Sequence, residues 1–304
     1  MLKVPNILIY EWRAWTGFLI SSLVEEQCRL CASPEDDISH LEPALRPGIE
    51  AVLFQINLSE SANFPLGRAK LITALENKGI KVLNKNIDDI TKRNLHVLLS
   101  KAGISTAKAS KAGDPEEILF VKSNLNWGGE VEHTLCPSLR DHYGPASSGS
   151  RITQHDQYYT IRRKDVTKDI WADRSLFIER YIDNTEDAFY RIYGCGASIV
   201  VVKAHARGLI KKINNHPLDI NYFFERQKII EEKTQLPESL QNVLRKFLTD
   251  FEIDYFCLDI VHDTQEYFII DLNLTPYLGP GGANPEASAF LIRGLRRHLR
   301  KPKS

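Results

Sequence analysis

Two carboxylates and an amide near the C-terminal end of the chain form its clearest chemical pattern. Asp259 lies in one β-rich run, and Asp271 and Asn273 lie in the next, with the polar segment 262–266 between the two runs. This alternation predicts a β-hairpin. Because side chains two residues apart on a strand share a face, Asp271 and Asn273 should point the same way. A three-residue loop at 264–266 would set Asp259 directly opposite Asp271, whereas a shift of one residue would turn it away.

Three oxygen ligands brought together in this way would suit Mg2+. In proteins this ion is usually held by one or two carboxylates and by the phosphates of a substrate. The hairpin therefore predicts a magnesium site for a nucleotide, with Asp259, Asp271 and Asn273 as metal ligands. The alternative is a surface hairpin with solvated acidic side chains, because short motifs of this kind also occur without function.

The composition gives no sign of a nucleic-acid or membrane partner. In 304 residues, 39 Lys and Arg balance 39 Asp and Glu, and only 293–303 is strongly basic, with apolar residues between its charges. No run of about 18 apolar residues occurs, and Glu11 and Arg13 interrupt the region that a signal peptide would keep apolar. Five cysteines without a repeated framework suit a reducing compartment. We therefore expect a cytoplasmic protein that binds neither nucleic acid nor a membrane.

Residues 1–88 alternate between strand and helix patterns, which predicts a small parallel α/β domain. The predicted elements are a strand at 6–10, a helix at 17–30, a strand at 50–57, a helix at 69–78 and a strand at 80–83. Ligands of such sheets lie beyond the carboxyl ends of the strands, so the loop 11–17 is a candidate substrate wall. Its Arg13 is predicted to bind a carboxylate or phosphate, whereas Trp12 and Trp15 are expected to pack in the core.

Further along the chain, lysines and glycines stand in positions that suit phosphate. The pattern predicts a helix over 88–102, which contains Lys92, and a strand over 118–122, which ends in Lys122. A glycine turn at Gly128 and Gly129 follows, and a lysine with free backbone N–H groups can lie there against phosphates. The next segment, 133–151, is rich in Pro, Gly and Ser and is predicted to be a lid.

The order of these motifs resembles that of the ATP-grasp superfamily over about residues 88–273. The motifs are a helix lysine, a strand lysine before a glycine loop, the segment Phe177-Ile-Glu-Arg-Tyr-Ile182, and a hairpin ending in Asp-x-Asn. The resemblance implies an α+β fold in which two α+β lobes clasp ATP after a small parallel α/β domain. The implied boundaries are 1–88 for the first domain, 89–182 for the first lobe and 183–304 for the second lobe with the metal hairpin.

The resemblance also implies roles for individual residues. The lysines and the glycine loop would meet the ATP phosphates, the backbone of 179–182 would read adenine, and an acid seven residues later would take the ribose hydroxyls. The residues assigned to ATP in this way are Lys92, Lys122, Gly128, Gly129, Glu179, Arg180, Tyr181, Ile182, Glu186 and Lys211. Arg191 would brace the transferred phosphate, and Arg207 is a second catalytic candidate. Arg207, Lys211 and Lys212 compete for one remaining phosphate contact.

Several of these residues also have a simpler interpretation. Lys92 could be a solvated helix lysine, Glu179 and Arg180 an exposed pair, Glu186 a loop acid, and Arg191 the surface partner of Asp187.

The activity implied by the resemblance is that of an ATP-dependent carboxylate–amine ligase, with ATP and Mg2+ as cofactors. A small-molecule or peptide carboxylate would become an acylphosphate, and an amine would convert it to an amide or peptide bond. His205 is a candidate base for the amine or else a structural residue. A small-molecule kinase that uses the same ATP site and a nucleotide-binding regulatory module without turnover are the alternatives, and a homodimer is compatible with each.

Overall fold

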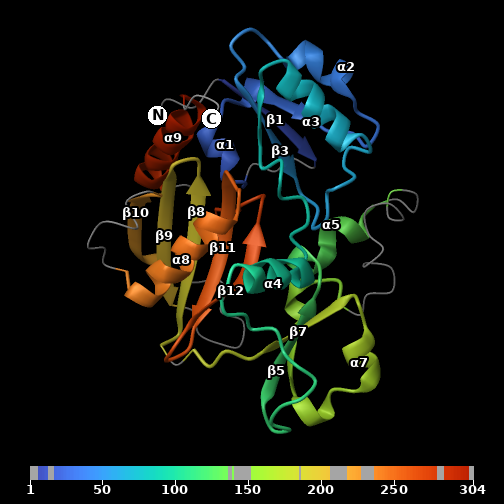
Figure 1. Cartoon of the computed structure of the whole chain (residues 1–304), viewed down its shortest axis with the longest axis vertical. Coiled ribbons are helices and arrows are strands. Elements are labelled where there is room, and N and C mark those ends of the chain that lie inside the picture. Colours follow the sequence, from blue (N-terminus) through green and yellow to red (C-terminus); the bar gives the residue numbers. More distant parts are fainter. Residues whose placement is uncertain are drawn as a thin grey trace.

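A computed structural model of the chain describes residues 6–12, 17–135, 139, 152–184, 186–205, 218–226, 236–278 and 284–300. Within these ranges the strands form three sheets of four, three and five strands, which follow one another along the chain (Figure 1). The mixture of helices and sheets confirms the predicted α+β class. Within the described ranges, no helix is long and apolar enough to cross a membrane.

The first sheet is parallel, with the strand order β2-β1-β3-β4, as expected for a small α/β domain. Its strands are β1 (Ile7–Trp12), β2 (Arg29–Cys31), β3 (Ala51–Ile56) and β4 (Lys81–Leu83), and its helices are α1 (Ile20–Leu23), α2 (Ile38–Leu41) and α3 (Arg68–Asn77). Two 3-10 turns, η1 (Glu26–Cys28) and η2 (Glu42–Ala44), complete it. Strands β1 and β3 are buried along almost their whole length, which matches their continuous apolar sequences.

The single helix predicted over 17–30 is wrong. Helix α1 ends at Leu23 because Val24 takes an extended conformation, with φ −120° and ψ 148°. After η1, Arg29 begins the edge strand β2 beside β1 and donates a hydrogen bond of 2.9 Å to the Glu11 carboxylate. This contact joins residues 18 positions apart, so the periodicity of the segment itself did not indicate it.

The second sheet is antiparallel, with β5 in its centre. Its elements are β5 (Ile118–Ser123), β6 (Tyr159–Arg162), β7 (Leu176–Arg180), the helices α4 (Lys92–Lys101), α5 (Glu130–His133) and α7 (Lys168–Ala172), and the 3-10 turns η3 (Asn126–Gly129), η4 (His155–Gln157) and η5 (Arg163–Asp165). Helix α4 begins at Lys92, later than predicted, because Thr91 is extended and its hydroxyl accepts the Asn94 N–H as an N-cap.

The third sheet is antiparallel, with the order β10-β9-β8-β11-β12. Its strands are β8 (Ala188–Cys195), β9 (Ser198–His205), β10 (Leu218–Glu225), β11 (Tyr255–His262) and β12 (Tyr267–Asn273), and its helices are α8 (Glu238–Asp250) and α9 (Pro285–Arg300). Helix α9 packs with α1 and the first sheet into one apolar cluster, so it joins the first domain to this sheet (Figure 1).

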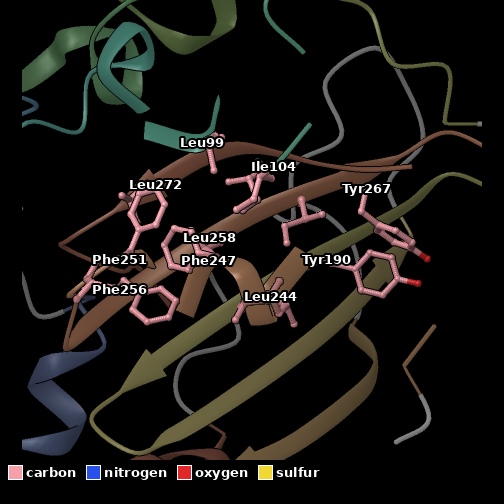
Figure 2. Packing of buried hydrophobic residues seen from close by; sticks show 14 of the residues in the cluster. Leu99, Ile104, Tyr190, Leu244, Phe247, Phe251, Phe256, Leu258, Tyr267 and Leu272 are labelled. Carbon is pink, nitrogen blue, oxygen red and sulfur yellow. The ribbon is translucent and has the colours of Figure 1, made fainter. Parts of the chain in front are cut away.

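Helix α8 covers the other face of the third sheet and forms the largest apolar core (Figure 2). Phe247 of α8 packs against Phe251 and Phe256, and Leu99 and Ile104 enter the same core from α4 and the segment after it. Helix α4 therefore touches the third sheet although its sequence precedes the second. The domain boundaries at 88 and 182 remain predictions.

The hairpin of β11 and β12 has the predicted pairing of Asp259 with Asp271, for a different reason. Near the turn, His262 pairs with Tyr267 and Ile260 pairs with Ile269. The next pair is Asp259 with Asp271, so the register shifts by one residue between these pairs. Ile270 is the extra residue of this bulge on β12. The bulge, and not a three-residue loop, sets the two carboxylates opposite each other.

Candidate functional site

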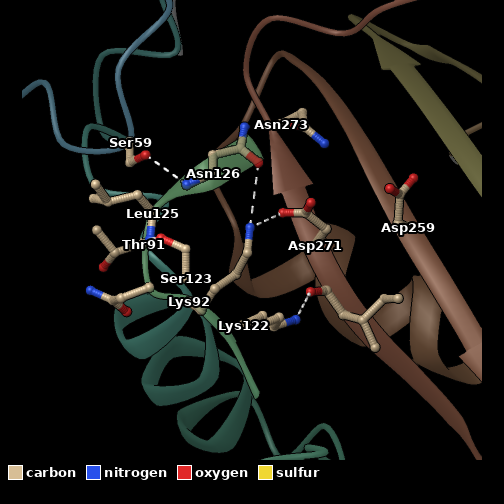
Figure 3. A network of polar contacts seen from close by, with 12 residues as sticks. Ser59, Thr91, Lys92, Lys122, Ser123, Leu125, Asn126, Asp259, Asp271 and Asn273 are labelled. Carbon is tan, nitrogen blue, oxygen red and sulfur yellow. Dashed lines mark hydrogen bonds and ion pairs between the residues drawn. The ribbon is translucent and has the colours of Figure 1, made fainter. Parts of the chain in front are cut away.

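The hairpin site consists of Asp259, Asp271 and Asn273 (Figure 3). Both carboxylates are buried, with residue exposures of 2% and 7%. Within the described ranges no cluster of three His, Cys, Asp or Glu side chains could hold a metal ion. The hairpin offers two carboxylates and an amide oxygen, which is the set that Mg2+ accepts when phosphate or water oxygens complete its shell.

Asp259 is neutralised by Arg191, which lies directly opposite it on the neighbouring strand β8. The guanidinium donates from Nε to Oδ1 at 2.8 Å and from Nη2 to Oδ2 at 2.9 Å. Burial alone would lower the pKa of Arg191, but the Asp259 carboxylate outweighs it and holds that pKa above its usual value. The alternative surface pair of Arg191 with Asp187 is therefore wrong.

Asp271 is neutralised from a different element, the first turn of α4. The Lys92 ammonium forms an ion pair with its carboxylate and lies 3.4 Å from the Asn126 amide oxygen (Figure 3). Lys92 is only 2% exposed, so it is not the solvated helix lysine of the simpler interpretation.

Lys122 reaches the same region from the end of β5. Its ammonium lies 2.7 Å from the Glu179 carboxylate and donates to the carbonyl of Ile270, the bulge residue, at 3.0 Å. Burial lowers the pKa of Lys122, and the Glu179 carboxylate opposes this shift. The resemblance implied that both lysines meet the ATP phosphates; the structure places both beside the hairpin, Lys92 in an ion pair with Asp271 and Lys122 in an ion pair with Glu179.

Two further residues of this network were not predicted. His96 lies one helical turn after Lys92 on the same face of α4, and its Nε2 is 3.0 Å from the Glu179 carboxylate. The Asn126 side-chain amide donates to the Asn273 oxygen, and its backbone N–H donates to the Ser59 hydroxyl at 2.8 Å. The i, i+4 spacing from Lys92 was the one sequence signal for His96.

Glu179 is buried and bonded through its side chain, so the predicted adenine hinge is more than a backbone feature. Burial raises the pKa of this carboxyl, but Lys122 and His96 outweigh it and bring the pKa below its usual value. The Arg180 and Tyr181 N–H groups donate to the carbonyls of Ala107 and Ile118.

Glu186 lies apart from the ion pairs of the hairpin. Its side chain is 63% exposed and its carboxylate lies 3.6 Å from His262 Nε2. The assignment of Glu186 to ribose, like that of the hinge to adenine, remains a prediction.

The glycine loop has the conformation that its sequence requires. Gly128 and Gly129 have φ values of 73° and 80°, and a side chain at Gly128 would collide with the Gln154 backbone. The Gly128 N–H already donates to the Tyr158 hydroxyl at 3.2 Å. Trp127 also has a positive φ, 49°, which is unusual for a bulky residue, and its indole stacks on His155.

A cavity of about 300 Å³, here called the hairpin cavity, adjoins the hairpin site. Its wall comes from the first domain, the glycine loop with α5, the strands β8, β11 and β12, and the segment after β12, and includes Phe18, Ser59, Trp127, Glu132, Asp271 and Tyr277. Lys92, Lys122 and the hinge are not part of it. The cavity is large enough for a small molecule, and it lies directly beside the ion pairs of the hairpin because Asp271 and Asn126, which contact Lys92, line it.

Four predicted basic residues, Arg13, Arg207, Lys211 and Lys212, lie outside the described residues, as does most of the predicted lid. Only the start of that segment, through Leu135, and Leu139 are described.

Comparison with solved structures identifies the fold. The chain is similar to the D-alanine–D-alanine ligase of Bacillus anthracis complexed with ATP, with a TM-score of 0.53 and 12% identity over 97% of each chain. It is also similar to the ATP-grasp ligase PsnB complexed with a minimal precursor, Mg and ADP, with a TM-score of 0.56 and 13% identity over 99% of this chain and 100% of that one. No protein-family model and no curated protein matches the sequence. The predicted ATP-grasp fold is confirmed.

Proposed function

We propose that this ATP-grasp protein is an ATP-dependent carboxylate–amine ligase that forms an amide or peptide bond through an acylphosphate. The observation that carries the proposal is the convergence of two buried lysines, Lys92 and Lys122, on the hairpin site. Buried lysines need anionic partners, and phosphates can replace Asp271 at Lys92 and join Glu179 at Lys122. The ATP complex of the D-alanine–D-alanine ligase and the Mg and ADP complex of PsnB support ATP and Mg2+ as cofactors.

The hairpin site fits Mg2+ by the chemistry of its donors. Asp271 and Asn273 would hold the ion from β12, and Asp259 from the facing strand, because all three offer hard oxygen ligands. Lys92 already pairs with Asp271 and Arg191 with Asp259, so both carboxylates are ionised and attract positive charge. When bound, Mg2+ would offset the negative charge of the phosphates during transfer.

The basic residues would stabilise the same charge from the protein side. Lys122 would bind phosphate oxygens from the end of β5, where its ammonium contacts Glu179 and the Ile270 carbonyl. Arg191 lines the hairpin cavity, and its proposed role is to brace the transferred phosphate. Arg207 and Lys211 remain candidates for a further phosphate contact, and Arg13 for the acid.

In the proposed reaction, a carboxylate oxygen of the first substrate attacks the γ-phosphorus, and ADP leaves. An amine then attacks the acyl carbon, and the C–O bond to phosphate breaks. Both steps need a site that excludes water, because acylphosphates hydrolyse. We propose a small-molecule or peptide carboxylate and an amine as the substrates, and the cytoplasm as the location.

A hydroxylamine-trapping screen tests this function. The protein is incubated with Mg-ATP, hydroxylamine and a panel of amino acids, dipeptides and other carboxylic acids. A ligase should yield a hydroxamate together with equal amounts of ADP and inorganic phosphate, because hydroxylamine intercepts the acylphosphate.

A kinase acting on a hydroxyl would give a different result from the same protein. It would convert ATP to ADP with a phosphorylated product, no hydroxamate and no free phosphate. That outcome, from a panel that also contains alcohols and sugars, would overturn the ligase assignment.

A further inference from the structure

Glu132 is a buried acid in the wall of the hairpin cavity, outside the network of the two lysines. Its residue is 2% exposed, and its Oε1 accepts the Ser59 N–H at 2.7 Å. Among the described residues, no Lys, Arg or His side chain forms an ion pair with it. A carboxylate is almost never buried to this extent without a cation, because the loss of hydration is so costly. Glu132 therefore has the surroundings of a group that receives a cation from a ligand.

The charges around the hairpin cavity favour the same kind of ligand. Its acidic lining residues are Glu130, Glu132, Asp259 and Asp271. Among the described lining residues, the basic one is Arg191, which donates two hydrogen bonds to Asp259. Because Mg2+ would occupy Asp259 and Asp271, Glu130 and Glu132 are the remaining acids of the lining, and of these two Glu132 is the buried one. The buried Glu132 carboxylate therefore favours a cationic group on its side of the cavity.

Trp127 adds an aromatic surface beside this acid. It lines the hairpin cavity, is 39% exposed and is held in the glycine loop by stacking on His155 at a centroid distance of 4.1 Å. Indole rings attract ammonium groups through their faces. Phe18, Leu58 and Val131 make much of the remaining wall apolar. An ammonium on a small apolar body matches these surfaces better than a zwitterion, whose carboxylate would face Glu132 and Glu130.

We infer that Glu132 and Trp127 form the binding site for the amine substrate, a protonated primary amine without a neighbouring carboxylate. This inference rests on the proposed ligase function for its chemical step. Glu132 takes one proton from the ammonium, and the freed nitrogen lone pair attacks the acyl carbon of the acylphosphate. The bond between the acyl carbon and the bridging oxygen of the phosphate then breaks, and phosphate leaves with the electron pair of that bond. The nitrogen loses a second proton as the amide forms. The balance is acylphosphate plus ammonium giving amide, hydrogen phosphate and one proton.

His205, the base considered from the sequence, is in a poorer position for this role. It is exposed, its Nδ1 lies 3.3 Å from the Glu186 carbonyl, and it does not line the hairpin cavity. Glu132 lies in the cavity wall that the acylphosphate would face across the hairpin site.

A binding experiment tests the subsite without any turnover. The probes are 3-methylbutylamine and L-leucine, which share a hydrocarbon body and differ by the carboxylate. We expect 3-methylbutylamine to raise the Tm of the wild-type protein, L-leucine to raise it less, and Glu132→Gln to abolish the rise. Gln can still accept the Ser59 N–H, so this variant should fold. No rise in the wild type, or an equal rise in Glu132→Gln, would overturn the inference.

A kinetic experiment separates this inference from the ligase function. With the acid found by hydroxylamine trapping, Glu132→Gln should lose far more amide formation with 3-methylbutylamine than hydroxamate formation, because hydroxylamine is mostly uncharged at neutral pH and needs no base to free its lone pair. Its KM for 3-methylbutylamine should rise about 10- to 100-fold, the value of a hydrogen bond to a charged group, and its kcat for the amide should fall as well, because Gln cannot take the ammonium proton. Trp127→Leu should raise the same KM about threefold to tenfold.

Glu130→Gln is the matched control. This neighbouring acid lines the same cavity, but its side chain is 41% exposed and lies 3.5 Å from His155, so its amine KM should change little. A parallel loss of hydroxamate and amide in Glu132→Gln would assign the residue to acid activation and contradict the subsite. Absence of hydroxamate with the wild type and every acid would instead overturn the ligase function, and the binding experiment would still decide the subsite.

Discussion

The two carboxylates of the hairpin site are neutralised in different ways. Asp259 faces Arg191 on the adjacent strand of the same sheet, and two hydrogen bonds fix the pair. Asp271 faces Lys92, which comes from a helix 179 residues earlier in the chain. A planar guanidinium held by two bonds is difficult to displace, whereas an ammonium on a flexible stem can change partners. The Asp259–Arg191 pair is therefore the fixed side of the site, whose partners stay together. The Asp271–Lys92 pair is the exchangeable side, whose cation can be replaced.

The largest expected effect is on stability, at the fixed side. Arg191→Met should lower the free energy of unfolding by about 3–5 kcal/mol, because it leaves the buried Asp259 charge without its partner. The double variant Arg191→Met/Asp259→Leu should recover much of this loss, since both charges are removed together. Urea denaturation of the three proteins measures the coupling.

Arg162→Met is the matched control for that experiment. Its partner is Glu116, and both side chains are more than half exposed, so the change should be within about 0.5 kcal/mol. A similarly small effect of Arg191→Met would show that the Asp259 pair is not the fixed element of the site.

At the exchangeable side the expected effect is on turnover. Asp271→Asn and Lys122→Ala should each reduce ADP formation about 100-fold or more, because both groups act on phosphate charge. Circular dichroism and Tm check that each variant is folded. Near-normal turnover in either folded variant would place the phosphate site elsewhere.

The hairpin was predictable because its signals are local. Alternation in two neighbouring runs placed Asp271 and Asn273 on one face, and the pairing of Asp259 with Asp271 is as expected. The route to that pairing was not predictable. A bulge at Ile270 depends on how the whole strand fits its neighbours, and this bulge also supplies the carbonyl that Lys122 binds.

The missed residues share a different property, which is that their partners are distant in sequence. His96 meets Glu179 across 83 residues, Asn126 meets Asn273 across 147, and Glu132 meets Ser59 across 73. Each is an ordinary helix or turn residue by its local pattern. Only the packing of α4 against the second sheet, and of the glycine loop and α5 against the third sheet and the first domain, gives them polar partners.

Nucleotide binding tests the exchange itself. Mg-ATP at a hundredfold excess over its Kd should stabilise the protein by about 2.7 kcal/mol, and EDTA should remove most of this gain. Lys92→Met should be stabilised by Mg2+ alone more than the wild type, because the ion then supplies the cation that Asp271 has lost. Thermal unfolding with and without Mg2+ measures both effects. Equal Mg2+ responses in the two proteins would contradict exchange at Asp271.

The smallest expected effect is on how the free energy of unfolding changes at acidic pH. It comes from the Glu179 carboxylate, which pairs with Lys122 and His96. The pKa of Glu179 lies below its usual value of 4.5, so its ionised form stabilises the fold at neutral pH. That contribution is complete above pH 4.5 and is lost as the pH falls through the lower pKa of the folded state. Glu179→Gln should therefore be less stable than the wild type at pH 7, and the difference should shrink on acidification.

The matched control is Glu186→Gln, whose exposed carboxylate should leave the pH profile unchanged. Urea unfolding from pH 7 to pH 3 gives the comparison, and a constant difference between wild type and Glu179→Gln would mean that the Glu179 charge does not stabilise the fold.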